Sequence, residues 1–136
     1  MIKTDAQRER TVVQIDGFRH ALAKSAQKAS GKRAAAIRGS YEEMIRQLEE
    51  EVREYDELKT GSFALPSIER LDQIAPFIVK IRIAKGVSQT ELAMRLDVSK
   101  QVISRHEEDQ YQSVNLNRLQ AILDVLGISV KVSITA

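Results

Sequence analysis

The sequence predicts an all-α protein with two parts, an N-terminal two-helix hairpin and a C-terminal group of short helices, followed by a short β-strand. Three observations support this prediction. Apolar residues recur at spacings of three and four over residues 41–55, sequences that cap helices precede two short stretches after residue 86, and residues 128–134 alternate between apolar and polar. The first two patterns are typical of α-helices and the third of a β-strand.

Composition excludes several classes of protein. The chain has 136 residues, no cysteine and two histidines, His20 and His106. Disulfides, a thiol nucleophile and a multi-histidine metal centre are therefore excluded. No apolar run approaches the roughly 20 residues that span a bilayer, and the first ten residues lack the apolar core of a signal peptide. We expect a cytoplasmic protein with no membrane partner and no cofactor.

Charge is unevenly distributed along the chain. The net charge of +2 hides nine basic and three acidic residues in 1–40, and three basic and eight acidic residues in 41–60. Residues 61–136 carry nine basic and eight acidic residues. The total charge therefore neither requires nor excludes a nucleic-acid partner, and the placement of individual groups must decide.

The first sixty residues read as an antiparallel helical hairpin with its turn within residues 29–40. A first helix is expected from about Asp5 to about Lys28, and a second from the capping box that Ser40 and Glu43 would form. Their apolar faces have helical spacing and consist of Val12, Ile15, Phe18 and Leu22 in the first helix, and of Tyr41, Ile45, Leu48, Val52 and Tyr55 in the second.

Residues 1–60 are thus predicted to be one domain and residues 66–136 a second. Two helices alone bury little apolar surface, so the hairpin either dimerises, binds a partner or serves as a solvated structural extension. Its basic first helix either contacts nucleic acid or stays solvated. Gly61 and Pro66 mark the boundary between the domains.

The second domain contains two short helices joined by a tight turn. A preceding helix ends at Lys85, with Gly86 after it. Ser88 and Glu91 form a capping box for the next helix, and Ser99 caps a further helix over residues 100–108. The turn at residues 97–98 forces the two helices to cross steeply, which is the geometry of a helix-turn-helix.

The first turn of the helix over residues 100–108 carries groups suited to DNA. A Gln can pair with adenine, a Lys with the acceptors of guanine, and a Ser with phosphate. Ser99, Lys100 and Gln101 supply these three side chains in succession. The alternative interpretation is a helix-turn-helix that serves packing alone, with Lys100 and Arg105 as solvated surface charges.

At these residues the chain resembles the XRE-type, lambda-repressor-like helix-turn-helix family. The resemblance covers the segment GVSQTELAMRLDVSKQVISRHEED and the following VNLNRLQAILDVLGI. The segment EEDQYQSVNLNRLQAI is also similar to HigA-type antitoxins. The resemblance to this family implies that the second predicted domain folds as a lambda-repressor-like DNA-binding domain.

The resemblance also implies roles for individual residues. The positions that would contact DNA bases or backbone are Gln89, Ser99, Lys100, Gln101, Val102 and Arg105. Arg82 and Glu107 match a buried ion pair that braces the family's fold. Asp97 stands where the family usually has Gly, although Asp can adopt the same left-handed conformation. The Gly that often follows the Glu is missing, so the chain need not leave the helix along the common path.

The sequence does not predict an enzyme. Acidic residues cluster near His106, but no nucleophile, phosphate-binding loop or second histidine accompanies them. His106 stands at an apolar position and is interpreted as a packed core residue.

The function that these predictions support is sequence-specific binding of double-stranded DNA by a transcriptional regulator, a dimeric repressor of a palindromic operator. The strand over residues 128–134 would pair with the same strand of a second copy, although a partner protein or a disordered end are alternatives. The alternative function is a HigA-like antitoxin that neutralises a toxin protein and represses its own operon.

Overall fold

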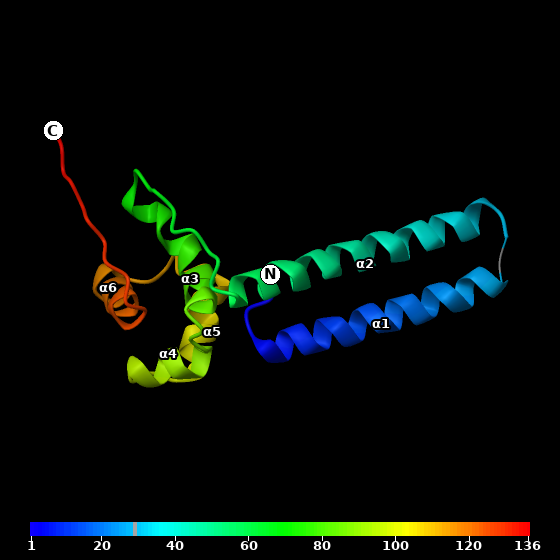
Figure 1. Ribbon diagram of the computed structural model, residues 1–136, viewed down its shortest axis with the longest axis horizontal. Helices are drawn as coiled ribbons and strands as arrows, with labels where there is room; N and C mark the ends of the chain where they lie inside the picture. The colour runs from blue at the N-terminus through cyan, green and yellow to red at the C-terminus, as the bar shows by residue number, and fades with distance from the viewer. Residues whose placement is uncertain (29) are drawn as a thin grey trace. The chain divides into compact units, whose positions relative to one another are not determined.

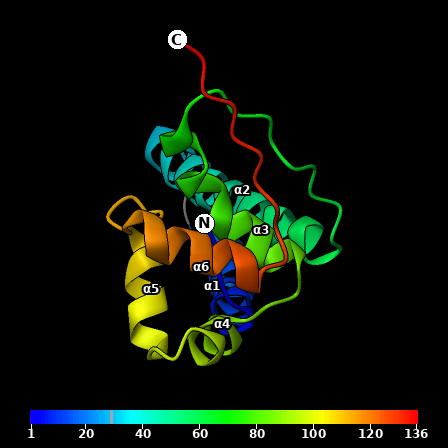
Figure 2. The ribbon, with the colours of Figure 1, turned by 90° about the vertical axis from the view of Figure 1, so that its left-hand side faces the viewer.

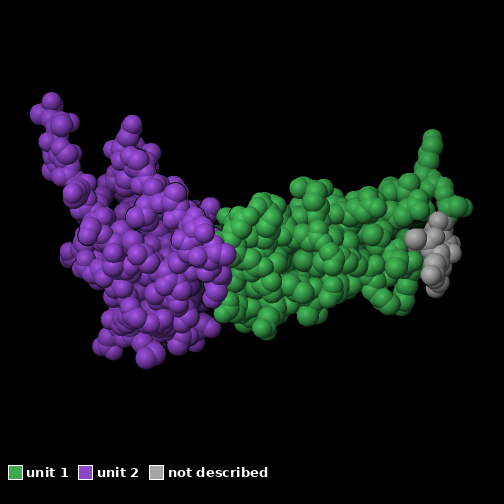
Figure 3. All heavy atoms as spheres, in the orientation of Figure 1, with its two compact units in different colours: residues 1–57 green, residues 58–136 purple. Residues whose placement is uncertain are grey.

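The chain divides into two compact units, residues 1–57 and residues 58–136 (Figure 3). The structure is a computed structural model and describes residues 1–28 and 30–136. All regular secondary structure among the described residues is helical (Figure 1). None of the described helices is long and apolar enough to cross a membrane.

The first unit is an antiparallel hairpin of α1 (Asp5–Lys28) and α2 (Lys32–Lys59) (Figure 1). Ile15 of α1 and Ile45 of α2 are buried, and the rings of Phe18 and Tyr41 pack with their centroids 5.9 Å apart. The apolar spacing of three and four therefore does form the seam between the helices, and α1 has the predicted bounds.

Polar contacts fix the register of the hairpin. Arg8 donates two hydrogen bonds, of 2.6 and 2.7 Å, to the carboxylate of Asp56, and the Tyr55 hydroxyl donates to Asp5 at 2.7 Å. The bonds from Arg8 hold the pKa of Asp56 below its ordinary value. Basic and acidic residues thus pair across the two helices near the ends where the hairpin opens.

The predicted start of α2 is wrong. Ser40 does not cap the helix, because α2 begins at Lys32, after Gly31 with a φ of +105°. Ala34 to Ala36, which lie between Gly31 and Ser40, are of the residue type with the highest helix propensity and lie in the first turns of α2. The connection between the helices is accordingly shorter than residues 29–40, and Ala29 of that range lies outside the described residues.

The second unit contains four α-helices preceded by two short 3₁₀ turns, η1 (Leu71–Gln73) and η2 (Ala75–Phe77). The helices are α3 (Ile78–Ala84), α4 (Gln89–Arg95), α5 (Lys100–Glu108) and α6 (Leu116–Val125). Each contributes one fully buried aliphatic residue to a common core, namely Ile78, Leu92, Ile103 and Ile122. The core therefore holds all four helices together around the one that carries Lys100 and Gln101.

The helix ends follow the predicted signals. Ser88 and Ser99 accept hydrogen bonds from the backbone N–H groups of Glu91 and Val102, at 3.0 and 3.4 Å. Gly86 has a φ of +70° directly after α3, as a glycine at a helix C-terminus does. The bounds of α5 are the predicted ones.

The predicted C-terminal strand is not formed. The chain leaves α6 through Gly127, with a φ of +69°, and the described residues 129–136 adopt neither helix nor strand. Alternation between apolar and polar residues is not sufficient for a strand, because the backbone also needs the hydrogen-bonding edge of a neighbouring strand. The described chain provides no such edge.

We expect Ser88→Ala to lower the free energy of unfolding by about 1 kcal/mol, because the N–H of Glu91 loses its cap. Urea denaturation measures this change. Ser67→Ala, at an exposed serine outside the helices, is the matched control and should change stability by less than about 0.5 kcal/mol. Equal effects of the two substitutions would contradict the capping role.

Candidate nucleic-acid interface

The connection between α4 and α5 is short and tightly hydrogen-bonded (Figure 2). The N–H of Asp97 donates to the carbonyl of Met94 at 3.2 Å, and that of Val98 to the carbonyl of Ala93 at 3.0 Å. Asp97 adopts a φ of +55°, the left-handed conformation predicted for a residue that replaces glycine. Ala93 is buried, and its small side chain permits a close approach of the helices. These features fix the angle at which α5 leaves α4.

A buried ion pair joins α3 to α5. The guanidinium of Arg82 donates to both carboxylate oxygens of Glu107, through Nε to Oε1 and through Nη2 to Oε2 at 3.0 Å. Nη1 of Arg82 donates to the carbonyl of Val87 at 2.8 Å. The side chains are only 3% and 0% exposed. Because buried charges are costly unless paired and hydrogen-bonded, this geometry fixes α5 against α3.

Gln89, which the resemblance places at the DNA backbone, belongs to the same buried network. Its Nε2 donates to Oε2 of Glu107 at 2.8 Å, and the residue is 5% exposed. Its amide is therefore engaged inside the unit, and a contact of Gln89 with DNA stays a prediction. The structural role of Gln89 is to join the start of α4 to α5.

Tyr111 is a further member of the network that the sequence interpretation missed. It is almost fully buried, and its hydroxyl donates to Oε1 of Glu107 at 3.3 Å. Gln110 and Tyr111 both have positive φ values, +55° and +60°, in the turn that follows α5. The absence of the usual glycine after Glu107 was the available signal, because it indicates an unusual path, but it does not identify the residue that turns inward.

The remaining predicted DNA-facing residues lie at the surface of α5 or at its N-cap. Ser99, Lys100, Gln101 and Arg105 are exposed, and Val102 is half-buried. Gln101 and Arg105 are four residues apart and share a face, whereas Ile103 and Glu107, also four apart, face the core. The Ser99 oxygen accepts the bond from Val102, so its own O–H remains able to donate. The first turn of α5 therefore presents hydrogen-bonding and cationic groups on a braced helix.

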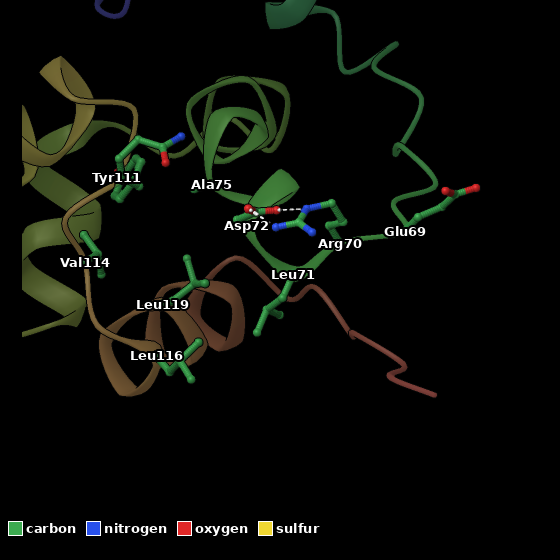
Figure 4. A pocket seen from close by; sticks show the side chains of 10 residues that line it. Glu69, Arg70, Leu71, Asp72, Ala75, Tyr111, Val114, Leu116 and Leu119 are labelled. Carbon is green, nitrogen blue, oxygen red and sulfur yellow. Dashed lines mark hydrogen bonds and ion pairs between the residues drawn. The ribbon is translucent and has the colours of Figure 1, made fainter. Parts of the chain in front are cut away.

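A pocket of about 550 Å³ lies elsewhere in this unit, between η1 and the start of α6 (Figure 4). Leu71, Leu116 and Leu119 line it together with the ion pair between Arg70 and Asp72, in which Nη2 lies 2.9 Å from Oδ2. The lining includes none of the predicted DNA-facing residues. The pocket is therefore separate from the surface of α5.

Comparison with known families supports a DNA-binding domain. Residues 78–132 match the model of a helix-turn-helix family. The match begins at the start of α3 and extends past α6, so it includes the buried network around Glu107 and the predicted DNA-facing residues of α5. Neither a curated protein nor a solved structure matches the chain significantly.

We expect Glu107→Gln to lower the free energy of unfolding by about 3–5 kcal/mol, because it leaves the charge of Arg82 buried without its counter-ion. Urea denaturation followed by circular dichroism measures the loss. The matched control is Arg95→Met, which breaks the exposed ion pair between Arg95 and Glu91 and should cost less than about 1 kcal/mol. A loss at Glu107 as small as that of the control would show that the buried network does not brace the unit.

The stability that the buried network contributes depends on pH through the ionisation of the Tyr111 hydroxyl. Burial, and then the charge of Glu107, raise the pKa of the Tyr111 hydroxyl above its ordinary value of 10.0. Above about pH 10 the unfolded chain releases this proton while the folded chain keeps it, so the stabilising contribution is complete below pH 10 and is lost as the pH rises further. At pH 7, Tyr111→Phe should be less stable than the wild type by about 1 kcal/mol.

We therefore expect the difference in stability between wild type and Tyr111→Phe to shrink between pH 9.5 and 11. Urea denaturation at a series of pH values measures it, and Tyr41→Phe in the hairpin serves as the control. A difference that stays constant over this range would exclude a buried, proton-retaining hydroxyl at Tyr111.

Proposed function

We propose that this chain, whose residues 78–132 belong to the XRE-type helix-turn-helix family, is a transcriptional regulator that binds double-stranded DNA through the first turn of α5. The single observation that carries this proposal is the exposed series Ser99, Lys100 and Gln101 at the start of a helix braced from within. Such a helix can enter the major groove with its N-terminal side chains toward the base edges.

The proposed contacts divide into two kinds. Gln101 reads adenine through its amide, and Lys100 and Arg105 contact guanine acceptors or phosphates. Ser99 donates to a phosphate and fixes the position of α5 on the duplex. Val102, half-buried beside them, can contact the methyl group of thymine. Phosphate contacts set the affinity and its dependence on salt, whereas Gln101 sets sequence preference.

We further propose that the regulator acts as a homodimer on a palindromic operator and represses by occupying a promoter. One α5 helix reads only a few base pairs, which is too little to select a site within a genome. Two copies related by a two-fold axis read two half-sites about 34–36 Å apart. Because one recognition helix reads too few base pairs, a dimer that supplies a second helix is favoured. Because the two copies of a dimer are related by two-fold symmetry, a palindromic operator is favoured as well.

The alternative proposal is a HigA-like antitoxin that neutralises a toxin and represses its own operon. What supports it is the resemblance of residues 107–122 and the existence of a separate unit, residues 1–57, outside the family match. That unit would have to bind the toxin. A small protein encoded beside the gene that co-purifies with the full chain and is lost on deletion of residues 1–57 would favour this alternative.

We expect Gln101→Ala to weaken binding to the preferred duplex by about 1–3 kcal/mol and to leave binding to random duplexes nearly unchanged. Selection of bound duplexes from a random pool identifies the preferred sequence, and fluorescence anisotropy at fixed salt measures the affinities. Gln112→Ala, at an exposed glutamine beyond α5, is the matched control. Equal losses on both kinds of duplex would exclude base reading by Gln101.

A further inference from the structure

The hairpin of α1 and α2 has two halves of opposite charge. Residues 17–41, which span the end where α1 connects to α2, contain six basic residues and no acidic residue. Residues 42–57 contain eight acidic and two basic residues, and residues 1–16 contain three of each. We call residues 17–41 the basic tip, and residues 1–16 with 42–57 the acidic base. The two halves carry equal and opposite formal charges.

Three of the basic residues of the tip are exposed and have no ion pair within the described structure. Lys24, Lys32 and Arg33 are exposed, and the described residues around them provide no ion pair. Arg19, at the edge of the tip, does pair with Glu49. α2 has 28 residues and a length of about 42 Å, so tip and base are on the order of 20 Å apart. This separation exceeds the Debye length of about 8 Å at physiological salt, so apart from the pair of Arg19 and Glu49 the two halves neutralise one another little within one chain.

α2 also exposes two apolar residues, one within the basic tip and one near the midpoint of the helix. Ile37 and Met44 are 42% and 41% exposed and lie seven residues apart, so they share one face of the helix. Met44 stands close to the midpoint of α2 (Lys32–Lys59). A hairpin of two helices has little core of its own, and a second layer of helices packed on this face would add to it.

We propose that the hairpin dimerises with a second copy in antiparallel orientation, through the face of α2 that carries Ile37 and Met44. A two-fold axis near Met44 places the basic tip of each copy against the acidic base of the other. A parallel dimer would instead place tip against tip and base against base, which like charges disfavour. The charge pattern thus favours a second copy of the chain as the partner, and it favours the antiparallel orientation of that copy.

Nucleic acid as the partner of the hairpin would account for fewer of these features than a second copy does. Phosphates would complement the tip, but they would be repelled by the base and would leave Ile37 and Met44 uncovered. The antiparallel dimer accounts for all three features. It specifies the dimer of the proposed function, but it is tested without DNA, so that either proposal can fail alone.

The main experiment reverses charges at each end in the full chain. Lys32→Glu/Arg33→Glu lowers the formal charge of the tip from +6 to +2, and Glu50→Lys/Glu57→Lys changes that of the base from −6 to −2. Sedimentation equilibrium of each variant alone should show a dissociation constant at least tenfold higher than that of the wild type. In an equimolar mixture the heterodimer should be tighter than either variant's own dimer, because one of its ends again pairs an unaltered tip of +6 with an unaltered base of −6.

Two controls separate these effects from misfolding and from total charge. Lys85→Glu/Lys131→Glu makes the same charge change as the tip variant at two exposed lysines of the second unit and should leave dimerisation unchanged. Met44→Lys, near the two-fold axis, should weaken the dimer, whereas Val13→Lys, at an apolar residue of α1 that is 70% exposed, should not. Circular dichroism checks that each variant keeps the helical content of the wild type.

Several results would overturn the proposal. A wild-type chain that is monomeric at 100 μM excludes it, and so does a dimer that both reversal variants retain, since that is the behaviour of a parallel arrangement. A tip variant that dimerises normally but shows a weaker dependence of duplex binding on salt would assign the tip to DNA instead. In each case the effect of Gln101→Ala on duplex binding remains a separate measurement.

Discussion

The position of α5 depends on the carboxylate of Glu107. Its two oxygens accept hydrogen bonds from Arg82 of α3, Gln89 of α4 and Tyr111 of the turn after α5, so that one buried charge joins three helices and the segment leading to the fourth. Aliphatic packing of Ile103 and Leu92 brings these helices together but allows small rotations. A carboxylate that accepts hydrogen bonds from fixed donors on several sides prevents such rotations, because each rotation would leave a buried polar group unpaired.

Under the proposed function, this arrangement would allow the few polar groups on the surface of α5 to recognise a specific DNA sequence. Reading a base edge requires that a side chain such as Gln101 start from a backbone held within a fraction of an ångström. Glu107 lies six residues from Gln101 on the opposite face of the helix and supplies this constraint from inside. Gln89 illustrates the same division of roles, since it is polar and stands at a helix start, but its amide is used to fix α5.

The sequence predicted those features that depend on local interactions and missed those that depend on distant ones. The bounds of α5, the cap at Ser88 and the left-handed Asp97 follow from the preferences of neighbouring residues, and the structure confirms them. Ser40 has the sequence of a cap but lies within α2, because the alanines before it continue the helix. The burial of Tyr111 and Gln89 could not be predicted locally, since both depend on Glu107. The strand predicted after Gly127 failed for the same reason, because a ladder needs a second segment.

Because the second unit has a modest net charge, its affinity for DNA would depend on how many copies of the unit bind together. With nine basic and eight acidic residues beyond residue 60, one unit has few cations to exchange for phosphate counter-ions, and its affinity is correspondingly low. A unit that binds with a Kd on the order of 10⁻⁴ M gains about tenfold once a tethered neighbour supplies an effective concentration on the order of 1 mM. Opposite charges that are separated along the hairpin can supply such a tether without adding net charge. In the proposed dimer, affinity for random DNA would stay low and the binding energy would be concentrated on paired half-sites.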